Sequence, residues 1–361
     1  MSNWPRHARN YLDIVSNISS NWWMRWDGQG VGVDDGALPG LQRIGFIRSV
    51  RAPQFEGMTF HEILCKSALN KVPNASMLPF KYTVNGYRGC SHACRYCFAR
   101  PTHEYLEFDS GTDFDTQVVV KTNVADVLRR ELSRRSWQRE TVALGTNTDP
   151  YQRAEGRYAL MPGIIAALTD SGTPFSILTK GTLLRRDLPL ITDAARRVDV
   201  SVAVSLAVGD PELHKDVEPG TPTPQARLGL ISAVREAGLD CHVMVAPVLP
   251  HLTDSAGHLD GLLGQIAAAG ATGVTAFGLH LRGSTRGWFM AWLARSHPEL
   301  VSVYRELYRR GAYLPSDYKK MLHDRVTPLI AKHGLAPDRR PFRAVAAPTV
   351  DCAEVLQPTL F

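Results

Sequence analysis

The chain has 361 residues, of which 44% are apolar and 21% charged, and its formal net charge is +6, as in many soluble globular proteins. It has no run of about 18 consecutive apolar residues to span a membrane, and residues 1–10 contain no apolar segment of a secretory signal. These features argue against a membrane partner and against secretion, so we expect a cytoplasmic protein.

Residues 1–80 form an irregular N-terminal layer in this prediction, because they are rich in Gly and Pro and have only short apolar runs. Residues 21–26 are aromatic without a clear period, and Met24 is an alternative start of the chain. One helical piece is predicted near Phe60–Leu69. It carries Cys65, which we interpret as a buried thiol.

Three of the six cysteines, Cys90, Cys94 and Cys97, follow with the spacing C-x3-C-x2-C. Three thiolates this close can hold three corners of a [4Fe–4S] cluster, which normally takes four cysteines. The fourth iron then keeps an open position, as catalytic metal sites do. A zinc site completed by His92 or His103 is an alternative. A disulfide is disfavoured because the cluster is odd in number and no secretory signal precedes it.

Strand-like and helical patterns then alternate regularly from Lys81 to Leu281. This order predicts a parallel sheet covered by helices, an α/β fold. The predicted strands are Lys81–Arg88, Thr141–Gly145, Phe175–Thr179, Val200–Leu206, Cys241–Ala246 and Val274–Leu279. The predicted helices are Asn123–Arg135, Gly163–Asp170, Arg185–Arg197, Pro224–Ala237 and Ala256–Ala269.

Large and small side chains alternate within these strands, which predicts the direction in which each side chain points. On the fourth strand the Val/Leu face should pack on the helices and leave Ser201, Ala203 and Ser205 toward the interior. On the fifth, Cys241 should point outward with Val243 and Val245. We therefore expect Cys241 to belong to the core.

The turns at the carboxyl ends of the strands are polar, and function gathers at this end of such barrels. The second strand is followed by the turn Gly145–Tyr151, and the third ends at Thr179-Lys180-Gly181. Ser205 closes the fourth, and the segment Glu218–Pro224 comes next, followed by Arg227. Taken singly, each of these is an ordinary capped loop.

The cysteine spacing with Tyr96 before the third cysteine, followed by these turns in order, resembles the radical S-adenosylmethionine (SAM) superfamily. Over about Lys81 to Leu281 the chain is similar to its spore photoproduct lyase branch. The resemblance implies a partial (β/α)6 barrel, a [4Fe–4S] cluster and bound SAM. Further matches are Tyr96 to the aromatic beside the cluster, and Thr148, Lys180 and Ser205 to SAM contacts. Lys180 and Arg227 are expected carboxylate partners, although a solvated helix face is the alternative for Arg227.

Two positions depart from the lyase pattern. Thr146 stands where the lyase has a hydrogen-donating cysteine, and Phe98 stands where it has a tyrosine. An aliphatic hydroxyl is a far poorer hydrogen donor than a thiol, which argues against repair by the lyase's own route. No catalytic residue is assigned from the sequence.

The family chemistry implied by the resemblance is reductive cleavage of SAM to a 5′-deoxyadenosyl radical, with an electron from a donor such as flavodoxin or ferredoxin. Three functions stay open: a radical SAM enzyme acting on DNA or another nucleic acid, one modifying a protein or small molecule, and a binding protein associated with the DNA sliding clamp or with DNA, whose cluster is structural or redox-sensing.

Residues 282–336 are predicted to form a basic helical extension. Between Arg282 and Arg343 there are 13 Lys and Arg against 5 Asp and Glu, a local net charge of +8. Aromatic residues at near-helical spacing should mainly cover the open side of the barrel: Trp288, Phe289, Trp292, Tyr304 and Tyr308. Basic residues among aromatics favour nucleic-acid binding, and a solvated basic surface is the alternative.

Residues 337–361 are predicted to be a flexible tail, because the segment is rich in Pro and Ala and has no periodicity. It ends in Gln357-Pro358-Thr359-Leu360-Phe361, which resembles the peptide by which bacterial repair proteins dock on the DNA sliding clamp. Leu360 and Phe361 would fill an apolar pocket and Gln357 would hydrogen-bond at its edge. The alternative is a terminus that folds back onto the core.

Overall fold

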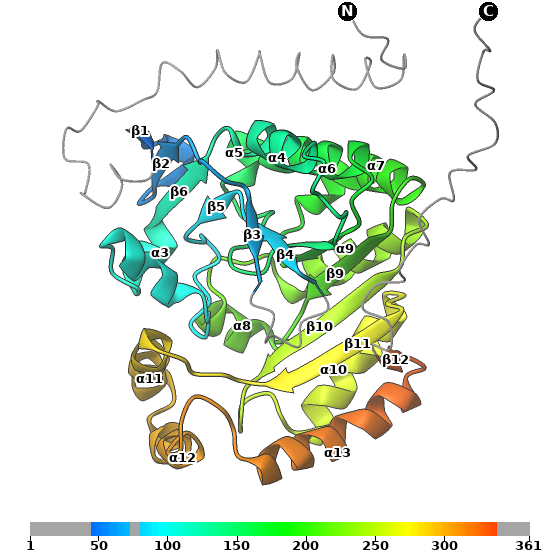
Figure 1. Ribbon diagram of the computed structural model, residues 1–361. Helices are drawn as coiled ribbons and strands as arrows, with labels where there is room; N and C mark the ends of the chain where they lie inside the picture. The colour runs from blue at the N-terminus through cyan, green and yellow to red at the C-terminus, as the bar shows by residue number, and fades with distance from the viewer. Residues whose placement is uncertain (1–44, 73–79, 338–361) are drawn as a thin grey trace, which may run out of the picture.

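The computed structural model describes residues 45–72 and 80–337, and its centre is an eight-stranded sheet with the order β12-β11-β10-β9-β8-β7-β4-β3 (Figure 1). Six consecutive strands are parallel: β4 (Tyr82–Val84), β7 (Val142–Leu144), β8 (Phe175–Thr179), β9 (Val200–Ser205), β10 (Cys241–Val248) and β11 (Gly273–Gly278). β12 (Ala336–Pro337) is parallel to β11, and β3 (Leu69–Lys71) is antiparallel to β4. The predicted partial (β/α)6 barrel is confirmed.

Helices cover the outer face of this sheet, as Figure 1 shows for α4, α6 and α7. The covering helices are α4 (Val124–Leu132), α6 (Leu160–Asp170), α7 (Leu184–Ala195), α9 (Pro224–Glu236) and α10 (Ala256–Ala268), and the loops hold α5 (Glu155–Tyr158) and α8 (Pro211–Val217). α4 buries Val124, Val127 and Leu128, the spacing of one helix face. The Thr223 hydroxyl caps α9 by accepting a hydrogen bond from the backbone N–H of Ala226.

The side chains of β10 point in the directions that the alternation predicts. Cys241, Val243 and Val245 of β10 lie in the large hydrophobic core with the helices. On the opposite face, His242 Nε2 lies 2.9 Å from the Thr275 hydroxyl of β11. This inner face, the lumen of the barrel, is open, because its side chains are only partly buried: Ser176, Leu178, Ser201, Ala203, His242 and Met244.

A second, four-stranded sheet replaces the predicted irregular layer over the described part of residues 1–80. Its order is β1 (Phe46–Val50), β2 (Thr59–Ile63), β6 (Gln117–Lys121) and β5 (Tyr87–Arg88). The helix predicted near Phe60–Leu69 is wrong, because β2 is a strand buried along its whole length and paired on both sides, parallel to β6 and antiparallel to β1. Buried strands and helices share such apolar patterns, so periodicity alone does not separate them.

The strand predicted over Lys81–Arg88 is two strands in different sheets, since the chain leaves β4 at Asn85 and enters β5 at Tyr87. The cysteine loop follows β5. It leads into three short elements, the 3-10 helix η3 (Arg100–Leu106), the helix α3 (Thr112–Thr116) and then β6. A further 3-10 helix, η2 (Pro53–Phe55), joins β1 to β2.

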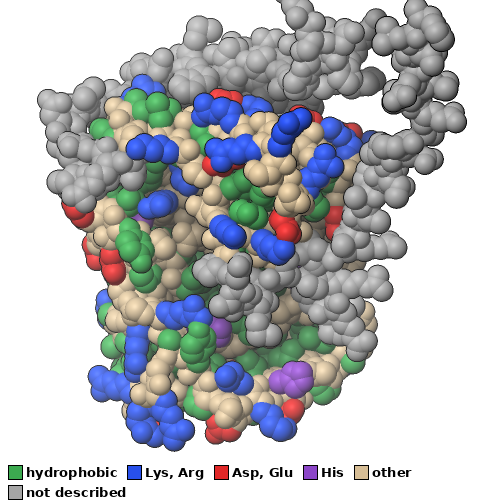
Figure 2. Space-filling view, viewed as in Figure 1, with side chains coloured by type: hydrophobic (Ala, Val, Ile, Leu, Met, Phe, Trp, Pro, Cys, Tyr) green, Lys and Arg blue, Asp and Glu red, His purple; other side chains and the backbone are tan. Residues whose placement is uncertain are grey.

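The chain after β11 is helical, with α11 (Ser284–Ser296), η4 (Pro298–Leu300), α12 (Val301–Leu307) and α13 (Ser316–Lys332). Phe289, Trp292, Tyr304 and Tyr308 are buried together in a second hydrophobic core. Lys and Arg side chains gather over α11 and α12 in the lower left of Figure 2. Within the described residues, no helix is long and apolar enough to cross a membrane.

Candidate active site

The loop from Gly89 to Phe98 is held in a tight shape by backbone and side-chain contacts. Gly89 has a positive φ of 81°, and a Cβ there would lie 2.8 Å from the carbonyl oxygen of Gln117. The Gln152 side chain accepts from the N–H of Ser91 and donates to the carbonyl of Gly89, each at 3.0 Å. The Cys90 N–H donates to the Phe114 carbonyl at 2.9 Å. Sequence positions far apart therefore fix where the three thiols lie.

The outer side of the loop is held by a buried arginine and by α11. Arg100 donates through Nε and Nη2 to the carbonyl of Cys94, at 3.2 and 3.0 Å, and forms an ion pair with Asp115 at 2.8 Å. The Thr285 hydroxyl of α11 donates to the Cys97 carbonyl at 3.1 Å. Arg100 is wholly buried, so its charge interacts with the loop and with Asp115 and is not solvated.

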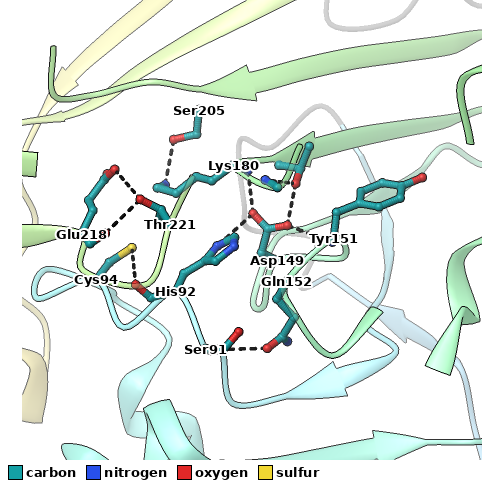
Figure 3. Close-up of polar contacts among 12 residues, drawn as sticks. Ser91, His92, Cys94, Asp149, Tyr151, Gln152, Lys180, Ser205, Glu218 and Thr221 are labelled. Carbon is teal, nitrogen blue, oxygen red and sulfur yellow. Dashed lines mark hydrogen bonds and ion pairs between the residues drawn. The ribbon is translucent and has the colours of Figure 1, made fainter. Parts of the chain in front are cut away.

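Asp149 joins the cysteine loop to the turns after β7 and β8 (Figure 3). Its carboxylate accepts from the Thr179 hydroxyl at 2.5 Å, from the Lys180 N–H at 2.6 Å and from the Tyr151 N–H at 2.9 Å. His92 Nδ1 lies 3.4 Å from Oδ2, the oxygen that also accepts from the Lys180 N–H. One carboxylate thus sets the relative positions of two loops of the site.

Lys180 extends from this joint toward β9, where its ammonium donates to the Ser205 hydroxyl at 2.8 Å (Figure 3). The same nitrogen lies 5.8 Å from the ring centre of Tyr96, within the range of a cation–π contact. Tyr96 is buried and its hydroxyl donates to Glu218. A cation, a hydroxyl and an aromatic ring therefore meet beside Cys94.

Glu218 and Arg227 form a wholly buried ion pair behind this group. Arg227 Nη2 lies 2.5 Å from Glu218 Oε2, and Nη1 donates to the Ser205 carbonyl at 3.0 Å. Burial would raise the pKa of Glu218, but the charges of Arg227 and Lys180 and the Tyr96 hydrogen bond lower it to about 2. Glu218 is therefore an anion that holds Tyr96 and Arg227 in place.

Asp149 and His92 are a second buried pair of opposite charges. Burial would raise the pKa of Asp149, and the nearby His92 together with the hydrogen bonds from Lys180 and Thr179 lowers it to about 2. Burial would lower the pKa of His92, but the charges of Cys90 and Asp149 raise it to about 10. The pair is an ion pair beside the cysteines.

Comparison with known proteins gives the family of this arrangement. The profile of the radical SAM superfamily matches residues 84–260, which include the three cysteines and the turns after β7, β8 and β9. The chain contains a radical SAM domain. An uncharacterised protein of Mycobacterium tuberculosis is 79% identical over 344 residues, covering 94% of this chain and 100% of that protein. An uncharacterised protein of Methanocaldococcus jannaschii is 28% identical over 197 residues, 54% of this chain and 69% of that protein.

Solved structures of spore photoproduct lyase share the radical SAM fold seen here. One, complexed with the dinucleoside spore photoproduct, has a TM-score of 0.58 at 15% identity and covers 77% of this chain and 81% of its own. Another, a mutant with bound AdoMet and the same dinucleoside, has a TM-score of 0.57 at 16% identity, covering 73% and 78%. At this identity the likeness concerns the fold.

The radical SAM fold brings most of the residues predicted from the sequence to one place: Cys90, Cys94, Cys97, Tyr96, Lys180, Ser205 and Arg227. Thr148 is buried and its hydroxyl donates to the Tyr87 carbonyl at 3.1 Å. The guanidinium of Arg227 is committed to Glu218 and Ser205 in this structure, and it does not lie on a solvated helix face. Gln357, Leu360 and Phe361 lie outside the described residues.

The three thiols suit the [4Fe–4S] cluster that radical SAM proteins carry. Burial, and then the nearby charge of Cys90, raise the pKa of Cys97 to about 11, and burial also raises the pKa of Cys94, so the thiolates of these two cysteines are disfavoured without a bound cation. Among the described residues, no three His, Cys, Asp or Glu side chains are placed to hold a single metal ion. A cube takes one thiolate on each of three irons and does not require that convergence.

The two histidines of the zinc alternative have other partners. His92 faces Asp149. His103 is wholly buried between Phe108 and Phe114, with Nε2 2.8 Å from the Gln117 carbonyl. The geometry therefore favours the cluster over a zinc ion at these cysteines.

Sequence reasoning missed three residues that organise the site: Asp149, Gln152 and Glu218. Asp149 and Glu218 stand in turns that the sequence marks as polar, but nothing in a single sequence distinguishes a buried carboxylate from a helix cap. Gln152 had no signal at all. Its role depends on a hydrogen bond with Ser91, which lies 61 residues away along the chain.

Proposed function

We propose that this protein reductively cleaves S-adenosylmethionine at a [4Fe–4S] cluster held by Cys90, Cys94 and Cys97, and that its substrate is DNA or another nucleic acid. The observation that carries the proposal is the meeting of Lys180, Ser205 and Tyr96 beside the cysteine loop. A cation and a hydroxyl at the carboxyl ends of barrel strands form a site for an anionic, polar cofactor.

In this proposal the three cysteines would hold the cluster, and the bound cofactors would supply the radical chemistry. The protein would hold the cofactors and the substrate in position and exclude water from them. Lys180 and Ser205 would hold the carboxylate of the cofactor, Tyr96 would pack beside it, and Thr148 would contact it from the turn after β7. Arg227 would act on the carboxylate through Ser205 and Glu218, the residues to which it is bonded.

Two further features support a nucleic-acid substrate. The similar lyase structures hold a dinucleoside photoproduct, and Lys and Arg gather over α11 and α12 on the face shown in Figure 2. Such a surface can bind the phosphates of a nucleic acid. This function requires an electron donor, such as flavodoxin or ferredoxin. It also suits an association with the DNA sliding clamp, which would bind Gln357, Leu360 and Phe361.

A protein or small-molecule substrate is the second candidate, and Thr146 favours it. Within the described residues, the two thiols outside the cysteine loop, Cys65 and Cys241, are buried in the hydrophobic core. Neither thiol lines the lumen. Neither can therefore return a hydrogen atom to a substrate radical in the lumen, as the donor cysteine of the lyase does.

The test is anaerobic reconstitution with iron and sulfide, reduction with dithionite, and chromatography for 5′-deoxyadenosine. The proposal predicts its formation, with a higher rate when oligonucleotides are added. A rate raised by peptides or small metabolites and not by oligonucleotides would favour the second candidate. A protein that holds a cluster but never cleaves SAM would be a structural or redox-sensing one, and the proposal would fail.

A further inference from the structure

Four side chains at the carboxyl end of β11 form an exposed group that the functions above do not use. We call Phe277, His280, Arg282 and Tyr313 the aromatic platform. Phe277 and Tyr313 are 42% and 46% exposed, whereas Phe289, Trp292, Tyr304 and Tyr308 nearby in sequence are buried. Large aromatic side chains left together in solvent mark an interaction site more often than chance exposure.

The rings of the platform contact one another. Phe277 stacks on His280 with ring centres 5.7 Å apart and an angle of 27° between the planes. His280 meets Tyr313 edge to face at 4.8 Å. The guanidinium of Arg282 lies 4.9 Å from the centre of the Tyr313 ring and donates to its hydroxyl. The group is therefore ordered before any ligand arrives, which lowers the entropy lost on binding.

The fold fixes the platform from behind. The Leu281 N–H donates to the Ala312 carbonyl at 2.9 Å, which ties the loop carrying Tyr313 to the end of β11. The buried Tyr308 hydroxyl donates to the Leu279 carbonyl at 2.7 Å. A Cβ at Gly278 would lie 2.3 Å from Leu314 Cδ1, so the strand and this loop are packed without a gap.

Strand alternation places Phe277 at the rim of the lumen. Val274 and Ala276 pack in the outer core, and Thr275 bonds His242 across the lumen face. Phe277 has the same parity as Thr275 and so faces the lumen. In the sheet register Thr275 lies opposite Met244, which lies opposite Ser205. Phe277 and Ser205 are therefore two strands apart, which is about 10 Å across the sheet. Along the strand direction, Phe277 lies about 7 Å closer to the mouth of the barrel than Ser205 does.

The chemistry of the platform selects its ligand. The rings offer flat apolar faces, Arg282 lies against the ring of Tyr313, and the charge of Lys319 acts on His280. Burial, Arg282 and Lys319 lower the pKa of His280, so its ring is neutral and able to stack near neutral pH. A flat ring system linked to a phosphate satisfies both features at once, whereas an aliphatic or acyl group would leave the cations without a role.

We infer that the aromatic platform binds an unpaired nucleobase of the substrate by stacking, with Arg282 and Lys319 on the adjoining phosphate. The inference rests on the proposed function and narrows it to single-stranded or flipped-out nucleotides. A base held at the rim would bring the neighbouring nucleotide over the lumen, above Ser205 and Lys180.

The test measures oligonucleotide binding by fluorescence anisotropy, using the reconstituted full-length protein at one salt concentration. The two probes are a labelled oligothymidine of about 12 nucleotides and an abasic oligomer of the same length. Phe277→Ala and Tyr313→Ala should weaken binding of oligothymidine about five-fold to about a hundred-fold, the contribution of one stacked base, and leave binding of the abasic oligomer unchanged.

Two control variants make the comparison specific. Tyr105→Ala removes an aromatic side chain that is 83% exposed on η3 and is not one of the four platform residues, and should bind both probes like the wild type. Tyr313→Phe loses the hydroxyl bonded by Arg282 but keeps the ring, and should retain the affinity for oligothymidine. Cluster content of each variant after reconstitution verifies its fold.

The inference is overturned if wild-type protein binds the two probes equally, if it binds neither, or if both alanine variants keep full affinity with the fold intact. The failure of the proposed function looks different. If 5′-deoxyadenosine never forms after dithionite reduction but oligothymidine binding depends on Phe277 and Tyr313, the platform stands and the proposed reaction does not. If SAM is cleaved and base-dependent binding is absent, the reaction stands and the platform fails.

Discussion

Cys94 is buried, and Arg100 donates two hydrogen bonds to its carbonyl. We expect Cys94→Ala to lose the [4Fe–4S] cluster, because the remaining two thiolates cannot hold it. Cys241→Ala should keep it, because Cys241 packs among Val243 and Val245 in the core. Iron and sulfide content after anaerobic reconstitution decides between them. Normal iron in Cys94→Ala, or lost iron in a folded Cys241→Ala, contradicts the assignment of the ligands.

Lys180 tests the cofactor site separately from the cluster. Lys180→Ala should weaken SAM binding roughly ten- to hundred-fold, since a charge-assisted contact contributes about 1.5–3 kcal/mol. Iron content should not change, because Lys180 is no cluster ligand and contacts Ser205 and the Tyr96 ring. Lys215→Ala, which removes an exposed lysine paired with Glu212 on α8, is the matched control. Calorimetric titration with SAM gives the result, and an unchanged affinity would place the cofactor elsewhere.

Glu218 makes stability depend on pH. Its pKa is held at about 2, below the usual value near 4.5, by Arg227 and Lys180 in spite of burial. The ionised form therefore stabilises the fold above about pH 5, and this contribution is lost as the pH falls toward about 2. Glu218→Gln should cost about 3–5 kcal/mol at neutral pH, because Arg227 is left buried without its partner.

The measurement is the unfolding temperature of wild type and Glu218→Gln across this acidic range. The two curves should converge as the pH falls. Glu212→Gln, which removes an exposed carboxylate of the same helical region, should follow the wild type throughout. Parallel curves for wild type and Glu218→Gln would mean that folding does not lower the pKa of Glu218.

At the scale of elements, the loop between α8 and α9 is pressed against the cysteine loop at Gly220. The Gly220 N–H donates to the His92 carbonyl at 3.1 Å, and a Cβ at Gly220 would lie 2.0 Å from the Ser91 carbonyl oxygen. Gly220→Ala should therefore separate the two loops and lower both cluster content and SAM affinity. Gly257→Ala on α10, where a Cβ meets nothing within 4 Å, should leave both unchanged.

Iron analysis and SAM titration of the two glycine variants provide the measurement. Gly257→Ala should also raise stability slightly, by up to about 1 kcal/mol, since Ala favours a helix over Gly. If Gly220→Ala reconstitutes and binds SAM like the wild type, the loops are not in the close contact described, and Glu218 would not be held where it meets Tyr96.

The elements with the clearest periodicity were predictable, and those that depend on distant pairing were not. β9 and β10 alternate between core and lumen side chains, and the structure confirms which of their residues face the core. β2 was mistaken for a helix because both its faces are buried, and its two edges pair with β1 and β6, which lie elsewhere in the chain. The split of Lys81–Arg88 into β4 and β5 likewise depends on partners more than 30 residues away.

At the scale of the whole molecule, the site could be found from the sequence because its parts stand at the carboxyl ends of consecutive strands. Lys180 and Ser205 fall on neighbouring strands, so their contact follows from the predicted order of β8 and β9. Glu218 and Arg100 could not be found, because their roles come from burial beside a single opposite charge, and neither burial nor pairing is written in local sequence.

The last prediction concerns the tail, which lies outside the described residues. If Gln357, Leu360 and Phe361 dock on the sliding clamp, the two apolar side chains contribute about 1.5–3 kcal/mol each before ordering costs. Fixing a flexible tail consumes part of this gain, so affinity in the micromolar range is expected. Deleting residues 357–361 should abolish binding to the purified clamp in calorimetry and leave cluster content and SAM cleavage unchanged, because the described barrel ends at residue 337, before the deleted residues begin. Absence of binding by the full-length protein at high micromolar concentration, or unfolding of the barrel after the deletion, would show that these residues belong to the core.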